Sequence, residues 1–138
     1  MLQVERRANH EAPPSDTLTL SYDERRRSRL RVRSDSGVDV LISLPQSSAM
    51  REGDLLEAQT GEVLRVCAAR EPVSEASTGD PLQFARAVYQ MGLRHVPLQV
   101  AVGVLRYRHD EALDRVMASL GLSVTEREAA FEPEVETL

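Results

Sequence analysis

The chain contains no lysine and no tryptophan, and it holds one cysteine and three histidines among its 138 residues. The single cysteine, Cys67, cannot form an internal disulfide, which is typical of proteins from reducing compartments. No apolar run approaches the roughly 20 residues needed to cross a bilayer, and the first residues lack the apolar stretch of a secretory signal. We therefore expect a cytoplasmic protein with no membrane partner.

The charge balance argues against a nucleic-acid partner. All 17 basic residues are arginine, and 22 acidic residues outnumber them, so the formal net charge is −5. Nucleic-acid affinity depends mainly on neutralising phosphates. One arginine-rich run, residues 25–33, has the look of a nucleic-acid patch, but within it Leu30 and Val32 alternate with arginines. That alternation predicts the solvated face of an edge strand, and protein docking is the alternative.

The first half of the sequence predicts β-structure. Apolar and polar residues alternate with period two over several short stretches separated by turn residues. We expect strands at 17–22, 30–33, 38–44, 55–58 and 63–69. No helical pattern interrupts them. We therefore predict a small all-β domain over residues 1–71, built as a sandwich or open barrel of two short sheets.

The second half changes to a helical period. Asp80 can cap a helix, Pro81 suits its first position, and Gln83 can close a capping box. Gly92 then predicts a left-handed end to this helix. A second amphipathic helix is expected over 110–120, with Gly121 as its terminator.

Strands are expected around these helices at 72–77, 96–102, 104–107 and 122–128. The resulting order, β-α-β-β-α-β, is the ferredoxin-like arrangement, an antiparallel sheet with two helices on one face. We therefore predict an α+β protein whose second domain covers residues 72–138. The acidic segment that begins at Phe131 is expected to fray.

Two of the three histidines fall at junctions between predicted elements rather than inside apolar runs. Neutral imidazole is the commonest transition-metal ligand among side chains, so metal binding is the first hypothesis. Period two would place His95 on the strand face away from Val96 and Leu98, where a partner or solvent covers it. The alternative for His95 is a solvent-facing turn histidine.

His109 precedes the second helix, whose first turn carries Asp110 and Glu111. These three side chains suit a metal ion, but first-turn acids beside a polar linker histidine explain the same pattern, and spacing alone favours that reading. Cys67 is most simply a small packed residue, and His10 a loop residue. The sequence holds no Cys-x-x-Cys, phosphate-binding glycine loop or nucleophile motif. We expect no enzyme.

Two blocks resemble a known signature. Residues 87–99 read Ala-Val-Tyr-Gln-Met-Gly-Leu-Arg-His-Val-Pro-Leu-Gln, and residues 105–111 read Leu-Arg-Tyr-Arg-His-Asp-Glu. Both closely resemble the UreE family of urease accessory metallochaperones, which typically reads Ala-Tyr-His-Leu-Gly-Asn-Arg-His-Val-Pro-x-Gln over the first block. The likeness extends over nearly the whole chain.

The resemblance implies a β-rich N-terminal domain that docks on partners and a C-terminal domain that binds nickel and forms a homodimer. It implies that His95 of both subunits shares one Ni2+, which Zn2+ or Cu2+ can replace, and that His109 is a secondary ligand. Asp110, Glu111 and Gln90 are further candidates. Some members have histidines where this chain has Gln90 and Glu111, and many end in a histidine-rich tail that this chain lacks, so extra metal sites and nickel storage are not expected.

The expected function is carriage of nickel for assembly of the urease active site. The partners that the resemblance implies are a urease accessory GTPase and the complex that assembles urease. The alternative is a protein-interaction module of that complex whose metal binding is weak or lost.

Overall fold

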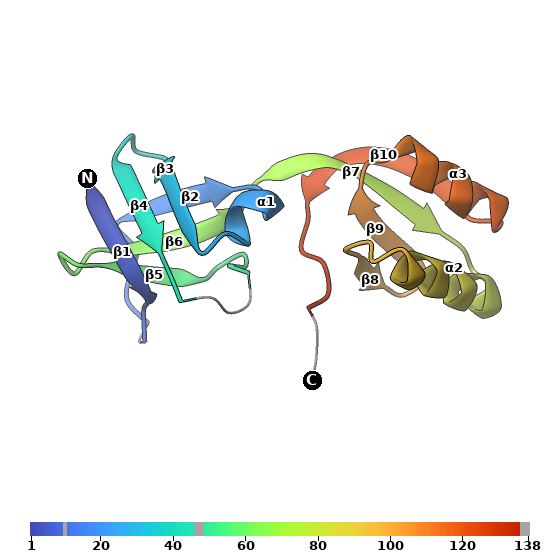
Figure 1. Cartoon of the computed structure of the whole chain (residues 1–138), viewed down its shortest axis with the longest axis horizontal. Coiled ribbons are helices and arrows are strands. Elements are labelled where there is room, and N and C mark those ends of the chain that lie inside the picture. Colours follow the sequence, from blue (N-terminus) through green and yellow to red (C-terminus); the bar gives the residue numbers. More distant parts are fainter. Residues whose placement is uncertain (10, 46–48, 136–138) are drawn as a thin grey trace. The chain divides into compact units, whose positions relative to one another are not determined.

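The computed structural model describes residues 1–9, 11–45 and 49–135. His10, predicted to lie in a loop, is outside the described residues. The chain divides into two compact units, Met1–Ala69 and Arg70–Leu138 (Figure 1). This division falls close to the boundary expected at residue 71. Among the described residues no helix is long and apolar enough to cross a membrane.

The first unit is built on one six-stranded sheet. Its strands are β1 (Leu2–Arg7), β2 (Asp16–Leu20), β3 (Arg29–Arg33), β4 (Asp39–Ser43), β5 (Leu55–Ala58) and β6 (Val63–Ala68). The strand order is β2-β6-β5-β1-β4-β3. The prediction of two short sheets is wrong, because β1 pairs with both β4 and β5 and joins all six strands.

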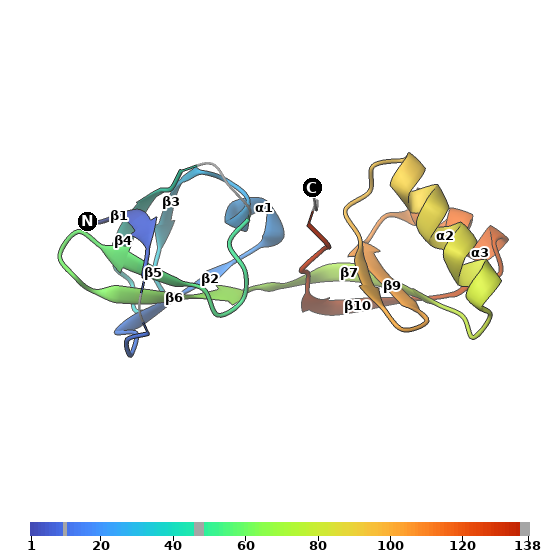
Figure 2. The same ribbon diagram turned by 90° about the horizontal axis from the view of Figure 1, so that it is seen from below.

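Inward-facing apolar residues from every strand of this sheet form one buried cluster. Its strand members are Val4, Leu18, Leu20, Leu30, Val40, Ile42, Leu56, Ala58, Leu64 and Val66. A flat sheet cannot bring residues from its two edge strands, β2 and β3, into a single cluster. The sheet therefore curls around its own inner face (Figure 2).

The arginine-rich run divides into two parts. The edge position of β3 and the exposure of its arginines, with Leu30 buried between them, confirm the predicted solvated strand face. The run begins at the last residue of a one-turn helix, α1 (Tyr22–Arg25), which the sequence analysis missed. Its last residue, Arg25, is 2% exposed and donates to the carbonyl oxygens of Leu20 and Met50. This arginine is part of the core rather than of the surface.

The second unit has the predicted order of elements. They are β7 (Arg70–Ser77), α2 (Pro81–Leu93), β8 (Gln99–Ala101), β9 (Val104–Arg108), α3 (Glu111–Ser119) and β10 (Ser123–Ala130). The sheet order is β10-β7-β9-β8, with every neighbouring pair antiparallel. Both helices lie on one face of this sheet (Figure 2). Ala76, Leu105 and Tyr107 of the sheet pack there with Ala87 and Met117 of the helices.

The helix starts follow the local sequence. The Asp80 side chain accepts from the backbone N–H groups of Leu82 and Gln83, which confirms the predicted cap. The predicted capping box is wrong: the Gln83 side-chain oxygen instead accepts from the Thr78 hydroxyl at 2.7 Å. Helix α3 is capped by Asp110, whose side chain accepts from the Leu113 N–H.

Strand β8 is much shorter than the predicted strand 96–102. Only Gln99–Ala101 pairs with β9, and the residues between α2 and Gln99 form an irregular segment. The apolar face that the predicted strand would present does not continue past Leu98, since Val100 and Val102 are 37% and 102% exposed. Because His95 lies outside any strand, the period-two argument that placed it also fails.

The C-terminal residues do not fray where the structure describes them. Phe131 is fully buried. The Glu132 N–H donates to the Gln99 side-chain oxygen at 2.9 Å, and the Glu134 N–H donates to the Leu98 carbonyl at 2.8 Å. The predicted fraying is therefore wrong for residues 131–134, and residues 136–138 lie outside the described part.

Candidate metal-binding residues at the end of helix α2

His95 holds the left-handed position at the C-terminal end of α2. Its φ of 56° is the only positive φ of a non-glycine residue in the described chain. The His95 N–H donates to the Gly92 carbonyl, and the Val96 N–H donates to the Met91 carbonyl, each at 3.1 Å. These two bonds define a Schellman end, and the apolar contact that accompanies it is supplied by Met91 and Val96 of one core cluster.

Glycine usually occupies this position, and the prediction that Gly92 does so is wrong. The helix continues through Gly92 to Leu93, and the left-handed residue is His95, three residues after Gly92. Helix α3 ends in the same motif with glycine in that place: Gly121 has a φ of 94°, and it and Leu122 donate to the carbonyls of Ala118 and Met117. The two helix ends therefore differ chiefly in carrying histidine or glycine at the left-handed residue.

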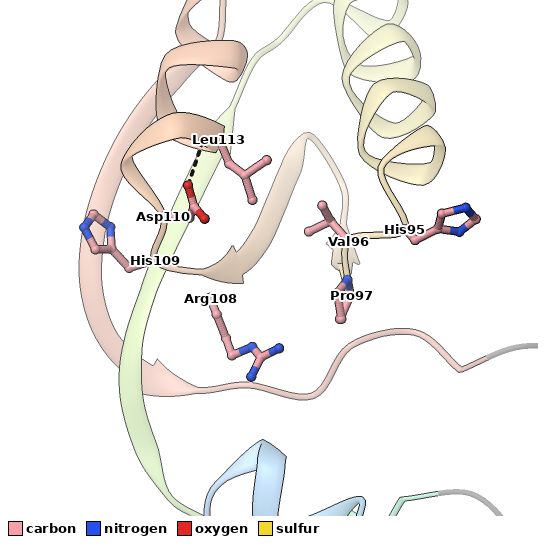
Figure 3. Close-up of a pocket in the computed structure, with 7 residues that line it drawn as sticks. All are labelled: His95, Val96, Pro97, Arg108, His109, Asp110 and Leu113. Atoms are coloured by element: carbon pink, nitrogen blue, oxygen red, sulfur yellow. Dashed lines mark hydrogen bonds between the residues drawn. The ribbon is translucent and has the colours of Figure 1, made fainter.

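The His95 side chain is exposed at this turn. Within the described residues, no hydrogen bond or ion pair holds its ring, so both ring nitrogens are available to a ligand. In Figure 3 the ring projects away from α2 and from the neighbouring Val96. The backbone is fixed while the imidazole remains accessible, which suits a side chain that binds an external group.

His95 and His109 line one cavity of about 450 Å³, together with Pro97, Arg108 and Asp110. Their rings point in opposite directions, however (Figure 3). No group of three or more histidine, cysteine or acidic side chains within residues 1–9, 11–45 and 49–135 is placed to hold a metal ion. The described part of one chain thus offers separate imidazoles rather than a complete metal centre.

His109 is held by polar side chains that the sequence analysis did not find. Its Nδ1 lies 3.1 Å from the Ser74 hydroxyl oxygen and 3.4 Å from an Asp114 carboxylate oxygen, and its Nε2 lies 3.8 Å from Glu126. Ser74 is fully buried on β7. The sequence signal for this contact was a polar residue at a core-facing position of β7. Connecting Ser74 with His109 also requires the register between β7 and β9, which the sequence does not reveal.

Tyr107 connects His109 to the core through Asp114. Its hydroxyl donates to Asp114 at 2.7 Å. Burial, and then the bond to this carboxylate, raise the pKa of Tyr107 well above its ordinary value of 10.0. The phenol therefore stays protonated and keeps Asp114 beside His109, which makes His109 a restrained histidine in contrast to His95.

The three further candidates are not assembled around either histidine. Asp110 is the N-cap of α3, where its side chain accepts from the Leu113 N–H. Glu111 is exposed in the first turn of α3. The Gln90 side-chain oxygen accepts from Arg94 at 2.7 Å, and the same guanidinium nitrogen also bonds the Gln90 carbonyl.

Comparisons with known proteins identify the chain. Residues 2–69 match the family described as "UreE urease accessory protein, N-terminal domain", and residues 71–137 match its C-terminal domain. A urease accessory protein UreE of Alkalilimnicola ehrlichii is 44% identical over 97% of this chain and 82% of its own length. The counterpart in Vibrio parahaemolyticus is 48% identical over 83% of this chain and 72% of its own length.

By these matches the chain is an accessory protein and not an enzyme. A third relative, from Pseudomonas putida strain W619, is 44% identical over 97% of this chain and 84% of its own length. The chain belongs to the UreE urease accessory protein family.

Proposed function

We propose that this protein is a nickel metallochaperone that delivers Ni2+ for assembly of the urease active site. Nickel is its cargo, and the ion is held between two copies of the chain by His95 of each. The observation that carries the proposal is the exposed His95 imidazole on a rigid helix end, in a family of urease accessory proteins.

A second copy of the chain completes the site. One imidazole cannot hold a divalent ion tightly, and the described part of a single chain contains no three-ligand group. In a two-fold symmetric dimer, equivalent residues meet at the axis, so one exposed His95 becomes two facing imidazoles. The ion then bridges the two subunits of a homodimer formed through the second units.

Such a site suits transfer better than storage. Two imidazoles leave most coordination positions of nickel to water or to oxygen ligands, and a recipient can occupy these positions as the ion leaves. The usual order of divalent affinities places copper above nickel and zinc near it, so Cu2+ or Zn2+ can substitute. Selectivity for nickel then comes from metal supply and from the partner.

His109 is proposed as a secondary ligand. Its Nδ1 faces Ser74 and Asp114, which leaves Nε2, on the side of the exposed Glu126, as the nitrogen open to a metal. Asp110, Glu111 and Gln90 contribute at most weak additional binding. Asp110 already accepts a hydrogen bond through one carboxylate oxygen, and Gln90 accepts one through its amide oxygen.

The two units take different parts in this role. We assign the second unit to metal binding and dimerisation, and its antiparallel sheet with two intervening helices supports the proposal of a ferredoxin-like βαββαβ domain. We assign the first unit to docking on the urease accessory GTPase and the urease assembly complex in the cytoplasm. Its exposed arginine face on the edge strand β3 is suited to an acidic partner surface.

Calorimetric titration with Ni2+ tests the proposal. The wild-type protein should bind one tight nickel per two chains, and His95→Ala should lose this binding. His109→Ala is the matched control, since it also removes one imidazole yet should weaken the tight phase by less than tenfold. Equal tight binding by wild type and His95→Ala contradicts the proposal.

A second candidate function is supported by the finding that the described residues of one chain form no three-ligand metal group. The protein would then act as an interaction module of the urease assembly complex, with weak or lost metal binding. Capture of the accessory GTPase by wild type and His95→Ala alike, without measurable nickel affinity in either, favours this candidate.

A further inference from the structure

The C-terminal tail forms a strap over the second unit. Residues 130–134 leave β10 and run past the segment that joins α2 to β8, where Figure 3 shows the pink tail ribbon passing Pro97. Arg106 on β9 donates to the Ala130 carbonyl at 2.8 Å. The N–H groups of Glu132 and Glu134 then donate to Gln99 and Leu98. We call residues 130–134 the strap.

The strap has the alternation of an extended strand. The donating N–H groups belong to residues 132 and 134, which point to the same side of an extended chain. Phe131 and Pro133 alternate with them and are buried, whereas Glu134 is exposed. Proline has no N–H, and it occupies a position whose N–H would point away from the bonded segment. The sequence of the strap therefore fits its conformation residue by residue.

The segment that the strap contacts is the one that carries His95. Only Val96 and Pro97 separate His95 from Leu98, and none of residues 95–98 belongs to a strand. Two hydrogen bonds hold His95 and Val96 to the end of α2, and the strap bonds hold Leu98 and Gln99 from the other side. His95 lies in the left-handed conformation, which is uncommon for a residue with a Cβ atom and persists where the surrounding structure holds it.

We infer that the strap positions His95: Gln99 and the backbone of residues 132–134 fix the segment that directs the imidazole toward its metal. They act through the backbone and are positioning residues, not ligands. The inference rests on the proposed function for its metal consequence. It also has a consequence in the metal-free protein, namely that loss of the strap loosens the end of α2.

Amide hydrogen exchange in the metal-free protein provides the first test. Gln99→Leu removes the side-chain oxygen that accepts from Glu132, and Gln99→Glu keeps an accepting oxygen at the same reach. A chain ending at Phe131 removes both strap donors and retains the buried ring, and a chain ending at Val135 is its matched control. The amides to follow are those of His95 and Val96, with Gly121 and Leu122 at the end of α3 as internal references.

Exchange at His95 and Val96 should accelerate at least tenfold in Gln99→Leu and in the chain ending at Phe131. It should stay near the wild-type rate in Gln99→Glu, in the chain ending at Val135 and at both reference amides. Unchanged exchange at His95 and Val96 overturns the inference. Equal acceleration at all four amides also overturns it, because that result describes general destabilisation.

Nickel titration of the same variants provides the second test. Gln99→Leu should bind Ni2+ at least fivefold more weakly than wild type, and Gln99→Glu should recover wild-type affinity. Equal affinities in all three proteins overturn the positioning role. If wild type binds no nickel, the proposed function fails, while the exchange rates still decide whether the strap orders the His95 segment.

Discussion

Replacing His95 by glycine should make the second unit more stable than replacing it by alanine. Both substitutions remove the imidazole, so they differ only in the Cβ atom at a residue whose φ is 56°. In ordinary backbone conformations the opposite order holds, because glycine loses more conformational freedom on folding than alanine, by roughly 0.5–1 kcal/mol. The sign of the difference therefore reports whether the left-handed turn exists.

The magnitude follows from two opposing contributions. A side chain in the left-handed region costs roughly 1–2 kcal/mol through the contact of Cβ with the following carbonyl. Glycine avoids that contact but loses roughly 0.5–1 kcal/mol in backbone entropy. From the centres of these two ranges, the glycine variant should be more stable than the alanine variant by about 0.75 kcal/mol, a roughly three- to fourfold difference in the ratio of folded to unfolded protein.

Urea unfolding, followed by the amide signals of α2, measures this difference within the second unit. Following local signals is necessary because two compact units need not unfold together. Gly121→Ala is the matched control at the end of α3 and should be destabilising, since a φ of 94° strains any residue with a Cβ atom, and the end of the Gln83 side chain, 2.6 Å from that Cβ, also has to move. An alanine variant at position 95 more stable than the glycine variant refutes the reasoning.

Acid should weaken the second unit partly through Glu75, whose pKa is lowered from its ordinary 4.5 by hydrogen bonds from Arg106 and then Arg127. A lowered pKa in the folded state adds stability above about pH 4.5, and this stability disappears as the pH falls through the folded-state pKa. Urea unfolding between pH 6 and 3 should therefore show that the free energy of unfolding falls less steeply for Glu75→Gln than for wild type. A steeper loss for the variant contradicts this sign. Burial, and then the charge of Glu52, raise the pKa of the Cys67 thiol. Iodoacetamide should modify Cys67 more slowly than a free cysteine at pH 7.5, and faster in Glu52→Gln; equal rates in both comparisons exclude the effect.

Local chemistry in the sequence was sufficient to predict the starts of α2 and α3, although it did not reveal α1. The pairing of Asp80 with Pro81 gives a capping side chain and a fixed φ within two residues, and no distant contact is needed to interpret it. Gly121 likewise ends α3 as predicted. The β-α-β-β-α-β order follows from these signals and from the change in hydrophobic period between the two halves.

The end of α2 could not be located by the same reasoning. Gly92 favours a left-handed turn by itself, and the local sequence contains no feature that excludes it. Packing decides the matter: Met91 is fully buried and Val96 packs against the same cluster, so a turn three residues after Gly92 satisfies the core. The contacts that select His95 are tertiary, and they override the intrinsic preference of glycine.

The strap shows the same limit in a different form. Its glutamates suggested a solvated tail, but Phe131 and Pro133 alternate with Glu132 and Glu134, which is the period of a half-buried strand. This alternation was present in the sequence, but the acidic composition of the tail led to the prediction of fraying instead. The contact with Gln99 links residues 33 positions apart, and only the folded sheet reveals it.

The candidate site was predicted through resemblance more than through geometry. Neither His95 nor His109 could be assigned to metal binding from spacing alone, and the strand phase that seemed to expose His95 does not exist in the structure. His95 is exposed for another reason, the left-handed turn at the end of α2. The contacts of His109 with Ser74 and Asp114 depend on strand register, so they could not be predicted from the sequence.

The claim that one nickel ion is shared by two His95 side chains is tested most directly with a mixed dimer. Differently tagged wild-type and His95→Ala chains are co-expressed, the dimer carrying both tags is isolated, and Ni2+ is titrated into it. A shared site predicts that the mixed dimer loses tight binding almost as fully as the homodimeric variant. Half of the wild-type capacity at unchanged affinity would contradict a shared site, because each chain would then hold its own nickel.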